Sequence, residues 1–296
     1  MNIKPFVKWA GGKSQILPDI RKKYPQQLGS SITKYCEPFV GGGAVLFDII
    51  LNNDIEEILI NDVNKELINS YIQIKFNLDI LLMELFKIQN CYWNMSAEKR
   101  KEFYYEKRER FNFLKINGDK DVNIEKAVLF IFLNKTCFNG LFRVNKNGLF
   151  NVPVGSYKKP VICDSDNLTD ISRLLKKVDI RCGDYKNTID FIDEKTFVYI
   201  DPPYRPLSAT ASFTAYTEMS FNDVEQSALK KFADDIDRKG AKFIVSNSDP
   251  KNNDETDNFF DDLYKSYYIE RVTAKRMINC NGESRGDISE LLISNY

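Results

Sequence analysis

Residues 197–204 read FVYIDPPY, which joins an apolar run to a carboxylate, two prolines and an aromatic ring. The apolar run is typical of a buried strand, and such a strand would deliver Asp201 to the carboxyl edge of a sheet, where α/β proteins bind ligands. The prolines restrict the backbone, and Pro202 offers a carbonyl acceptor without a competing N–H donor. Tyr204 offers a flat face on which a base could stack. This combination suits chemistry on an amino group held beside an aromatic ring.

Methylation of an exocyclic amino nitrogen is the reaction that these residue types favour. The lone pair of such a nitrogen is conjugated with its ring, so the nitrogen is a poor nucleophile. Hydrogen bonds from its protons to the Asp201 carboxylate and the Pro202 carbonyl would draw it toward a tetrahedral geometry and free the lone pair to attack a sulfonium methyl group. The alternative is a rigid turn at a strand end with a packed Tyr204.

A glycine-rich turn predicts a nucleoside cofactor. Residues 37–43 read EPFVGGG, follow an apolar run and precede a helical pattern, and Gly41 and Gly43 would let the main chain pass close to a ligand. The third glycine of the dinucleotide fingerprint would fall at Leu46, so a pyrophosphate is not indicated. Asp62 ends the next apolar run, where a carboxylate accepts hydrogen bonds from ribose hydroxyls. The alternative is a tight turn beside a solvent-facing Asp62.

The amino-terminal segment FVKWAGGKSQI, residues 6–16, looks like the end of a phosphate-binding Walker A loop. That loop needs a glycine where this chain has Val7, and a branched residue cannot make the turn. Too few residues precede the segment to form the buried strand that leads into such a loop. A nucleoside triphosphate site is therefore not indicated, and Lys13 needs another role.

Composition narrows the functional classes further. The chain of 296 residues has six cysteines, no C-x-x-C pair and no histidine, so zinc binding and histidine-based catalysis are nearly excluded and we expect no metal. We expect the cysteines to be small buried side chains in a reducing compartment. The sequence has no apolar run of about eighteen residues and no signal pattern, so we expect a soluble cytoplasmic protein without a membrane partner.

Short apolar or β-branched runs predict strands between helical patterns. The predicted strands are residues 35–38, 57–61, 178–182, 197–200, 242–245 and 290–293. The predicted helices between them are residues 45–52, 65–74 and 223–236. Strands that alternate with helices indicate an α/β fold whose sheet is mostly parallel, with helices on both faces.

Residues 78–164 break this alternation and are predicted to be an insertion. They hold helical patterns at 80–88, 96–111 and 127–135, then two β-prone runs around an Asn147-Gly148 hairpin turn. Residues 126–163 carry six basic side chains and no acid, although the net charge of the chain is zero. Residues 249–262 carry six acids, and a charge run of this kind is usually a solvated face. We therefore expect an α/β domain of residues 1–77 and 165–296 and an insertion of residues 78–164.

The motifs together resemble those of the Dam-type (D12 class) site-specific DNA adenine N6-methyltransferases. Their order is that of the family: a lysine motif, a glycine motif, a target-recognition region and D-P-P-Y. The segments that carry the resemblance are FVKWAGGK, YCEPFVGGG, IND, CFNGLFRVN, FNVPVGSYKKP, CGDY, FVYIDPPY and SRGDISE. The resemblance implies a Rossmann-like S-adenosylmethionine-dependent methyltransferase sheet with an inserted helical and β-hairpin DNA-recognition domain.

The resemblance also implies which residues hold S-adenosylmethionine. Trp9 would face the adenosine or sulfonium end, where an aromatic face attracts a cation, and Lys13 would pair with the methionine carboxylate. Asp62 would bind the ribose, and Asp201 would lie where cofactor and target base meet. Asp184 and Tyr185 would lie around the cofactor adenine. The set expected at the cofactor is Trp9, Lys13, Glu37, Phe39, Gly41, Gly43, Asp62, Asp184, Tyr185 and Asp201.

The same resemblance assigns the basic insertion to double-stranded DNA. The recognition hairpin of the family reads GATC in the major groove, and its N-G-L-x-R pattern falls on residues 139–143. Arg143 would pair with guanine O6 and N7, and Leu141 suits a thymine methyl group. Asn139 belongs to the same DNA-contacting pattern.

Three further DNA contacts are implied. Phe138 would fill the base stack when the target adenine flips out, Lys8 would touch DNA near the first guanine, and Pro153 would lie on the returning strand of the hairpin. Phe138 and Leu141 have an alternative role as core residues. Related enzymes with other targets share parts of C-F-N-G and F-N-V-P, so these segments also fit target sequences other than GATC.

The expected activity is methyl transfer from S-adenosylmethionine to adenine N6 in duplex DNA, with Asp201, Pro202 and Tyr204 as catalytic residues. One alternative is an amino-methyltransferase that acts on cytosine N4 or on RNA. Another is a DNA-binding protein of the same fold without catalysis. Glutamine methylation would call for N-P-P-Y in place of D-P-P-Y. The sequence leaves open the oligomeric state and any partner endonuclease.

Overall fold

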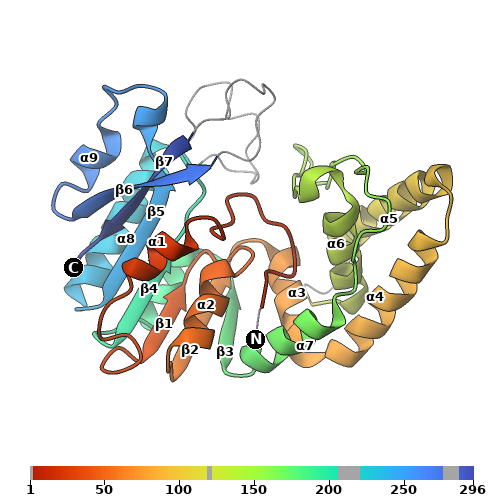
Figure 1. Ribbon diagram of the computed structural model, residues 1–296, viewed down its shortest axis with the longest axis horizontal. Coiled ribbons are helices and arrows are strands. Elements are labelled where there is room, and N and C mark those ends of the chain that lie inside the picture. Colours follow the sequence, from red (N-terminus) through yellow and green to blue (C-terminus); the bar gives the residue numbers. More distant parts are fainter. Residues whose placement is uncertain (1–2, 119–121, 206–220, 276–286) are drawn as a thin grey trace.

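The computed structural model describes residues 3–118, 122–205, 221–275 and 287–296. Cys280 and residues 284–286 of the SRGDISE segment lie outside the described residues. The described part contains one β-sheet with helices on both faces and a helical lobe beside it (Figure 1).

Within the described residues, seven strands form one sheet in the order β3-β2-β1-β4-β5-β7-β6. The strands are β1 (Lys34–Glu37), β2 (Glu57–Asp62), β3 (Val178–Cys182), β4 (Thr196–Ile200), β5 (Lys242–Ser248), β6 (Tyr268–Lys275) and β7 (Asp287–Ser294). β1 to β5 are parallel, and β7 pairs antiparallel with both β5 and β6. The six predicted strands and the mostly parallel α/β fold are confirmed. β6 was missed because its sequence, YIERVTAK, mixes charged with apolar residues, as an edge strand allows.

Alternate residues of the central strands pack into separate cores on the two faces of the sheet. Tyr35 and Phe197 belong to a core with α1 (Leu17–Lys22), α2 (Ala44–Asn52), α3 (Lys65–Phe76) and α7 (Ser165–Leu175). Cys36 and Val198 belong to a core with α8 (Asp223–Arg238) and α9 (Phe259–Leu263). Strands buried on both faces read as continuous apolar runs, which is why they were recognisable in the sequence.

Helix starts explain part of what the sequence revealed. α8 begins with a capping box in which Asn222 accepts from a backbone N–H and Glu225 reaches back to the Asn222 N–H. Side chains of Asn64 and Asp164 cap α3 and α7. α2, α3 and α8 were predicted, whereas α1 and α9, with six and five residues, are too short to show a helical period.

The helical lobe lies between α3 and α7 and contains α4 (Leu78–Trp93), α5 (Ala97–Asn117) and α6 (Ile124–Thr136). The three predicted helical segments lie in these helices. α6 packs against α3, α4 and α5 and is buried on nearly all sides, so the apolar core of one sheet face continues into the lobe. Figure 1 shows α4, α5 and α6 together on the side of the molecule away from β5, β6 and β7.

A hairpin follows α6, as the Asn147-Gly148 pair predicted. Val144 bridges Phe150 in antiparallel fashion, and the Asn145 N–H donates to the Leu149 carbonyl at 2.8 Å. Gly148 has a φ of +70°, a left-handed conformation that glycine adopts without strain. The predicted turn is confirmed.

The cysteine prediction is only partly correct. Cys36 and Cys137 are buried and Cys163 is half-buried, but Cys91 and Cys182 are exposed. Cys91 lies on the solvent side of α4, and Cys182 is the last residue of the edge strand β3, so neither position borders the core. The thiols of Cys36, Cys91, Cys137 and Cys163 form no disulfide.

The acidic segment 249–262 is less unbalanced in three dimensions than in sequence. Asp249 and Asp261 pair with Arg271, and Asp257 pairs with Arg205 at 2.6 Å. Both arginines lie outside the acidic segment, so the fold supplies basic partners for Asp249, Asp257 and Asp261.

Candidate active site

Four acidic side chains lie at the carboxyl edge of the parallel strands. Glu37 and Asp62 end β1 and β2. Asp184 follows β3 by two residues, and Asp201 follows β4 directly. Because carboxyl ends of parallel strands meet at one edge of a sheet, residues from distant parts of the sequence share this site.

The Asp201 carboxylate accepts hydrogen bonds from two other segments of the chain. Its Oδ1 lies 2.9 Å from Lys13 Nζ and 2.8 Å from the Ser246 hydroxyl, while 21% of the side chain stays exposed. Burial raises the pKa of Asp201 above its ordinary value, whereas the Lys13 charge and the Ser246 hydroxyl act in the opposite direction. Oδ2 has no donor among the described residues, so it is the oxygen open to an incoming N–H group.

The Tyr204 ring is fixed beside Asp201. Its hydroxyl donates to Glu290 Oε2 on β7 at 2.7 Å. Burial, together with the Asp201 and Glu290 carboxylates, raises the pKa of Tyr204, so the phenol stays protonated and keeps donating. The sheet thereby presents a carboxylate and an oriented aromatic ring next to each other.

Lys13 lies between these two groups. Its ammonium is 2.9 Å from Asp201 Oδ1 and 4.7 Å from the centre of the Tyr204 ring, and it also donates to the Gly11 carbonyl at 2.6 Å. Only 4% of the residue is exposed. The expected pairing with the methionine carboxylate of the cofactor stays a prediction.

The glycine turn after β1 requires glycine at two positions. Gly41 has a φ of +48°, and a Cβ there would lie 2.9 Å from the Trp9 ring. Gly43 has a φ of +78°, and a Cβ there would lie 2.6 Å from the Tyr71 hydroxyl. That hydroxyl donates to the Gly41 carbonyl at 3.0 Å. The turn is therefore held in a conformation that keeps its backbone open at the sheet edge.

Two carboxylates support this turn. Asp62 accepts from the Gly41 N–H at 3.1 Å and the Asn64 N–H at 2.9 Å, and carboxylate oxygens keep further lone pairs for ligand hydroxyls. Glu37 is 2% exposed and accepts from the Tyr35 hydroxyl at 2.8 Å. Burial raises the pKa of both carboxyls, that of Glu37 strongly. Glu37 thus lies beneath the turn, whereas Asp62 lies at its side.

Aromatic side chains flank the turn. Phe39 and Tyr185 have ring centres 5.0 Å apart, and Tyr185 also packs edge-on against Phe232 of α8. Asp184 is exposed and caps the short helical turn that begins at Tyr185. Trp9 stacks on Phe142 of the lobe with ring centres 5.9 Å apart. The predicted cofactor residues therefore come from the glycine turn itself and from four other segments, which are residues 9–13, Asp62, residues 184–185 and Asp201.

Lys8 joins the amino-terminal segment to the recognition hairpin. The Asn134 side chain accepts from the Lys8 N–H and donates to the Lys8 carbonyl, each at 2.8 Å. The Lys8 ammonium lies 3.0 Å from the Tyr157 hydroxyl. Gly140 has a φ of +65°, and a Cβ there would come within 3.0 Å of three stem carbons of Lys8. The structure thus brings Lys8 beside Gly140 of the N-G-L-x-R pattern, and the contact of Lys8 with DNA stays a prediction.

The other protein residues that were predicted to contact DNA lie along the hairpin or next to it. Phe138 is 52% exposed, which argues against its alternative role in the core, and its N–H donates to the Pro153 carbonyl at 2.8 Å. Leu141 is half-buried against the core. Asn139 is exposed with a φ of +55°. Pro153 is exposed on the returning strand.

Arg143 is half-buried and oriented by one hydrogen bond. Its Nε donates to Asn151 Oδ1 at 2.8 Å, across the hairpin. Among the described residues its two terminal nitrogens make no hydrogen bond, and these are the nitrogens that can approach guanine O6 and N7 together.

Sequence reasoning missed three residues that hold the site. Ser246 donates a hydrogen bond to Asp201, and Glu290 accepts one from Tyr204. Asn134 holds the Lys8 backbone. Each had a signal: Ser246 directly follows a predicted strand, Glu290 lies in SRGDISE, and Asn134 is a polar residue after a long apolar run. The partner of each, however, depends on the tertiary fold.

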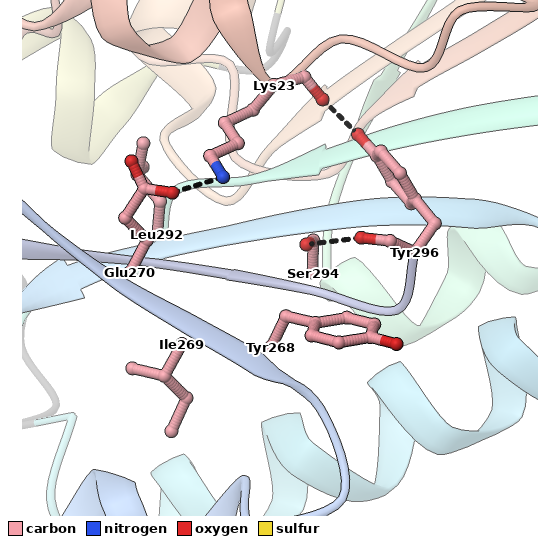
Figure 2. A pocket seen from close by; sticks show the side chains of 7 residues that line it. All are labelled: Lys23, Tyr268, Ile269, Glu270, Leu292, Ser294 and Tyr296. Atoms are coloured by element: carbon pink, nitrogen blue, oxygen red, sulfur yellow. Dashed lines mark hydrogen bonds and ion pairs between the residues drawn. The ribbon is translucent and has the colours of Figure 1, made fainter.

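A surface pocket of about 310 Å³ lies away from this site (Figure 2). It is lined by Lys23, Tyr268, Ile269, Glu270, Leu292, Ser294 and Tyr296. Lys23 forms an ion pair with Glu270, and its carbonyl accepts from the Tyr296 hydroxyl. Ser294 pairs with Ile244 near the start of β5, so the pocket lies at the edge opposite the carboxyl ends of the parallel strands. It is therefore separate from the acidic edge.

The part of the chain that the structure describes lacks two features. No helix there is long and apolar enough to cross a membrane. No group of three or more histidine, cysteine, aspartate or glutamate side chains there could hold a metal ion.

Comparison with known proteins places these features in context. A family model described as D12 class N6 adenine-specific DNA methyltransferase matches residues 9–278. The chain is 49% identical to the Type II methyltransferase M.MjaIII of Methanocaldococcus jannaschii, with the full length of both chains covered. It is 36% identical to the Type II methyltransferase M1.LlaDCHI of Lactococcus lactis subsp. cremoris, over 100% of this chain and 96% of the relative. It is 34% identical to the DNA adenine methylase of Escherichia coli K12, over 98% and 94%.

Proposed function

Because the chain belongs to the D12 class of N6 adenine-specific DNA methyltransferases, which methylate adenine in double-stranded DNA, we propose that Asp201, Pro202 and Tyr204 carry the reaction and that the target lies in GATC. Family membership sets aside the cytosine-N4, RNA and inactive-binder alternatives. In this proposal residues 1–77 and 165–296 form the catalytic domain, and residues 78–164 form the target-recognition unit.

One observation supports the catalytic assignment most strongly. The Lys13 ammonium donates to Asp201 and lies over the Tyr204 ring, so carboxylate and ring together accommodate a nitrogen that donates hydrogen bonds. A target adenine would place N6 against Asp201 and its ring against Tyr204. Lys13 would then leave Asp201, and its ammonium would be available to an anionic group of the cofactor.

The chain acts on the amino group mainly by position and electrostatics. Asp201 and the Pro202 carbonyl would accept hydrogen bonds from the two N6–H groups and draw the nitrogen toward a tetrahedral geometry, which frees its lone pair to attack the methyl group. The bond from sulfur to the methyl carbon breaks as the N–C bond forms, the cofactor leaves as a neutral thioether, and one N6 proton is lost. S-adenosylmethionine supplies a methyl group on a positively charged sulfur. Asp201 must be ionised to accept the hydrogen bond from N6–H through either carboxylate oxygen. Its raised pKa makes this requirement sensitive to pH.

The glycine turn and its surroundings fit this cofactor. Gly41 and Gly43 keep the turn free of side chains, and Asp62 would accept from the ribose hydroxyls. Tyr185 and Phe39 would face the adenine, with Asp184 beside them, and Trp9 would face the sulfonium. Glu37 would act from beneath the turn, because it is 2% exposed.

The hairpin supports recognition of DNA. Arg143 would read a guanine through its terminal nitrogens, Leu141 would contact a thymine methyl group, and Phe138 would enter the base stack. Lys8, Asn139 and Pro153 lie next to these residues and would complete the contact. Phosphate contacts should make the affinity fall steeply as salt rises.

Nucleoside analysis of methylated duplexes tests the function and its target together. A duplex with one GATC site would be incubated with the protein and labelled S-adenosylmethionine, then digested to nucleosides. We expect N6-methyl-2′-deoxyadenosine from this duplex and little from matched duplexes that each carry one changed base pair of the site. Equal labelling of all duplexes would contradict the GATC assignment and leave adenine methylation intact.

A further inference from the structure

Three side chains form a line of hydrogen bonds that ends on Asp201. The Tyr199 hydroxyl donates to Ser246 Oγ at 3.1 Å, and the Ser246 hydroxyl donates to Asp201 Oδ1 at 2.8 Å. Tyr199 and Ser246 are fully buried, at 0% exposure. Family membership assigns a role to neither residue.

The sheet itself creates this line. Tyr199 and Asp201 are two residues apart on the β4 segment and therefore point to the same face. The parallel pairing of β4 with β5 runs to Ile200 opposite Val245, which brings Ser246 beside Asp201. A position set by strand pairing varies little, so the serine hydroxyl meets the carboxylate at a defined angle.

The direction of the bonds follows from distance. A serine hydroxyl has one proton, and the alternative acceptor, the Ile200 carbonyl, is 3.5 Å away compared with 2.8 Å for Asp201 Oδ1. The Tyr199 proton occupies a lone pair of Ser246 Oγ and so turns the serine proton toward Asp201.

We infer that Ser246 is a positioning residue for methyl transfer and that Tyr199 orients it. The serine holds Oδ1 of Asp201 so that Oδ2 accepts a hydrogen bond from the N6–H group of adenine. The inference rests on the proposed catalytic role of Asp201. Lys13 also holds Oδ1, but it comes from a loop and has to yield when adenine enters. Ser246 can stay, so it maintains the orientation of the carboxylate during the reaction.

Ser246 also affects the charge state of the site. The charged and titratable groups that face Asp201 are Lys13 from the amino-terminal loop, Glu37 from β1, Tyr199 and Tyr204 from the β4 segment, and Glu290 from β7. Against burial, the Ser246 bond lowers the pKa of Asp201. Loss of the hydroxyl should therefore raise this pKa.

The test uses Ser246→Ala and Tyr199→Phe in the full chain, assayed by single-turnover methylation of a GATC duplex from pH 5 to 9. Because the lost bond is to a charged group, we expect Ser246→Ala to slow transfer by about 10- to 100-fold and Tyr199→Phe by less. We also expect the acidic limb of the Ser246→Ala profile to move to higher pH, with dissociation constants for duplex and for S-adenosylmethionine unchanged.

Ser248→Ala is the matched control, because Ser248 lies on the same strand and its buried hydroxyl has no hydrogen-bond partner in the described part of the chain. It should transfer at the wild-type rate. A Ser246→Ala protein with a wild-type rate and pH profile would overturn the inference, as would a loss explained entirely by weaker cofactor or DNA binding. Asp201→Ala distinguishes a failure of the proposed function from a failure of the positioning role of Ser246. If it stays active, the proposed function of Asp201 fails; if it is inactive while Ser246→Ala is normal, only the positioning role fails.

Discussion

At the acidic edge of the sheet, Asp201 and Tyr204 are bonded by Lys13, Ser246 and Glu290. In the recognition hairpin, by contrast, Phe138 is 52% exposed and its side chain has no hydrogen-bonding group. The hairpin instead has its backbone held, by Asn134 and by pairing across the turn.

The difference corresponds to two tasks. A reaction that depends on the direction of hydrogen bonds needs side chains in fixed positions, which buried polar contacts provide. In the proposed function, reading of base pairs needs side chains that reach out of the protein, so the hairpin fixes mainly the backbone, and Arg143 is held through Nε alone while its terminal nitrogens make no hydrogen bond to the described residues. Changes at the acidic edge should therefore alter rate, and changes in the hairpin should alter target choice.

The largest expected effect is that of Asp201→Ala. Loss of the carboxylate removes an acceptor for the N6 proton, so we expect methyl transfer to fall by about 1,000-fold or more. Duplex affinity should stay close to wild type, since the hairpin is untouched. Single-turnover assays and gel-shift titrations measure the two quantities, and near-normal turnover would refute the catalytic assignment.

Arg143→Ala should change the choice of target sequence more than the rate of methyl transfer. We expect it to relax discrimination at one guanine by about 1–3 kcal/mol and to leave the rate on the best substrate less affected. Competition between duplexes that differ at one base pair measures this. A uniform loss over all sequences would mark Arg143 as a phosphate contact instead.

Gly140→Ala tests whether the hairpin backbone is held in advance. Its φ of +65° disfavours alanine, and the new methyl group would press on the Lys8 stem. We expect a loss of folding stability of about 1–2 kcal/mol together with weaker duplex binding. Gly148→Ala, with a φ of +70° but no Lys8 contact, is the matched comparison. Equal effects on DNA binding would show that the Lys8 contact contributes nothing.

The smallest expected effect concerns pH. The Asp201 carboxyl has a raised pKa in the folded protein, so activity that needs the carboxylate should rise as pH increases through that pKa. Lys13 opposes the rise in pKa in the protein without ligands, so Lys13→Met should move the acidic limb of kcat/KM, which reports the free enzyme, to still higher pH. A shift toward lower pH would contradict the ion pair seen here.

The pH dependence that Asp201 gives to folding stability is opposite in direction to the pH dependence that it gives to activity. A carboxyl whose pKa is higher in the folded state binds its proton more tightly there. Its contribution to stability is therefore present below the unfolded pKa and is lost as pH rises through the folded pKa. Asp201 thus favours folding least at the pH where it is most active.

Prediction from sequence worked where the signal is local. β4 was visible as an apolar run because both faces of the strand are buried, and the turn at Asn147-Gly148 was visible because few residue pairs adopt that geometry. It failed for β6, whose polar residues conceal an edge strand, and for Cys182, whose exposure depends on β3 lying at the edge of the sheet.

The sequence by itself determined the strand pattern, the glycine turn and the types of side chain available for chemistry, since each depends on residues that are close in the chain. Only the tertiary structure decided that Lys13 and Ser246 meet Asp201, that Glu290 meets Tyr204, and that Lys8 lies against Gly140. The physical reason is that such contacts depend on strand order and on the path of the chain between elements. Neither of these is encoded in any short stretch of residues.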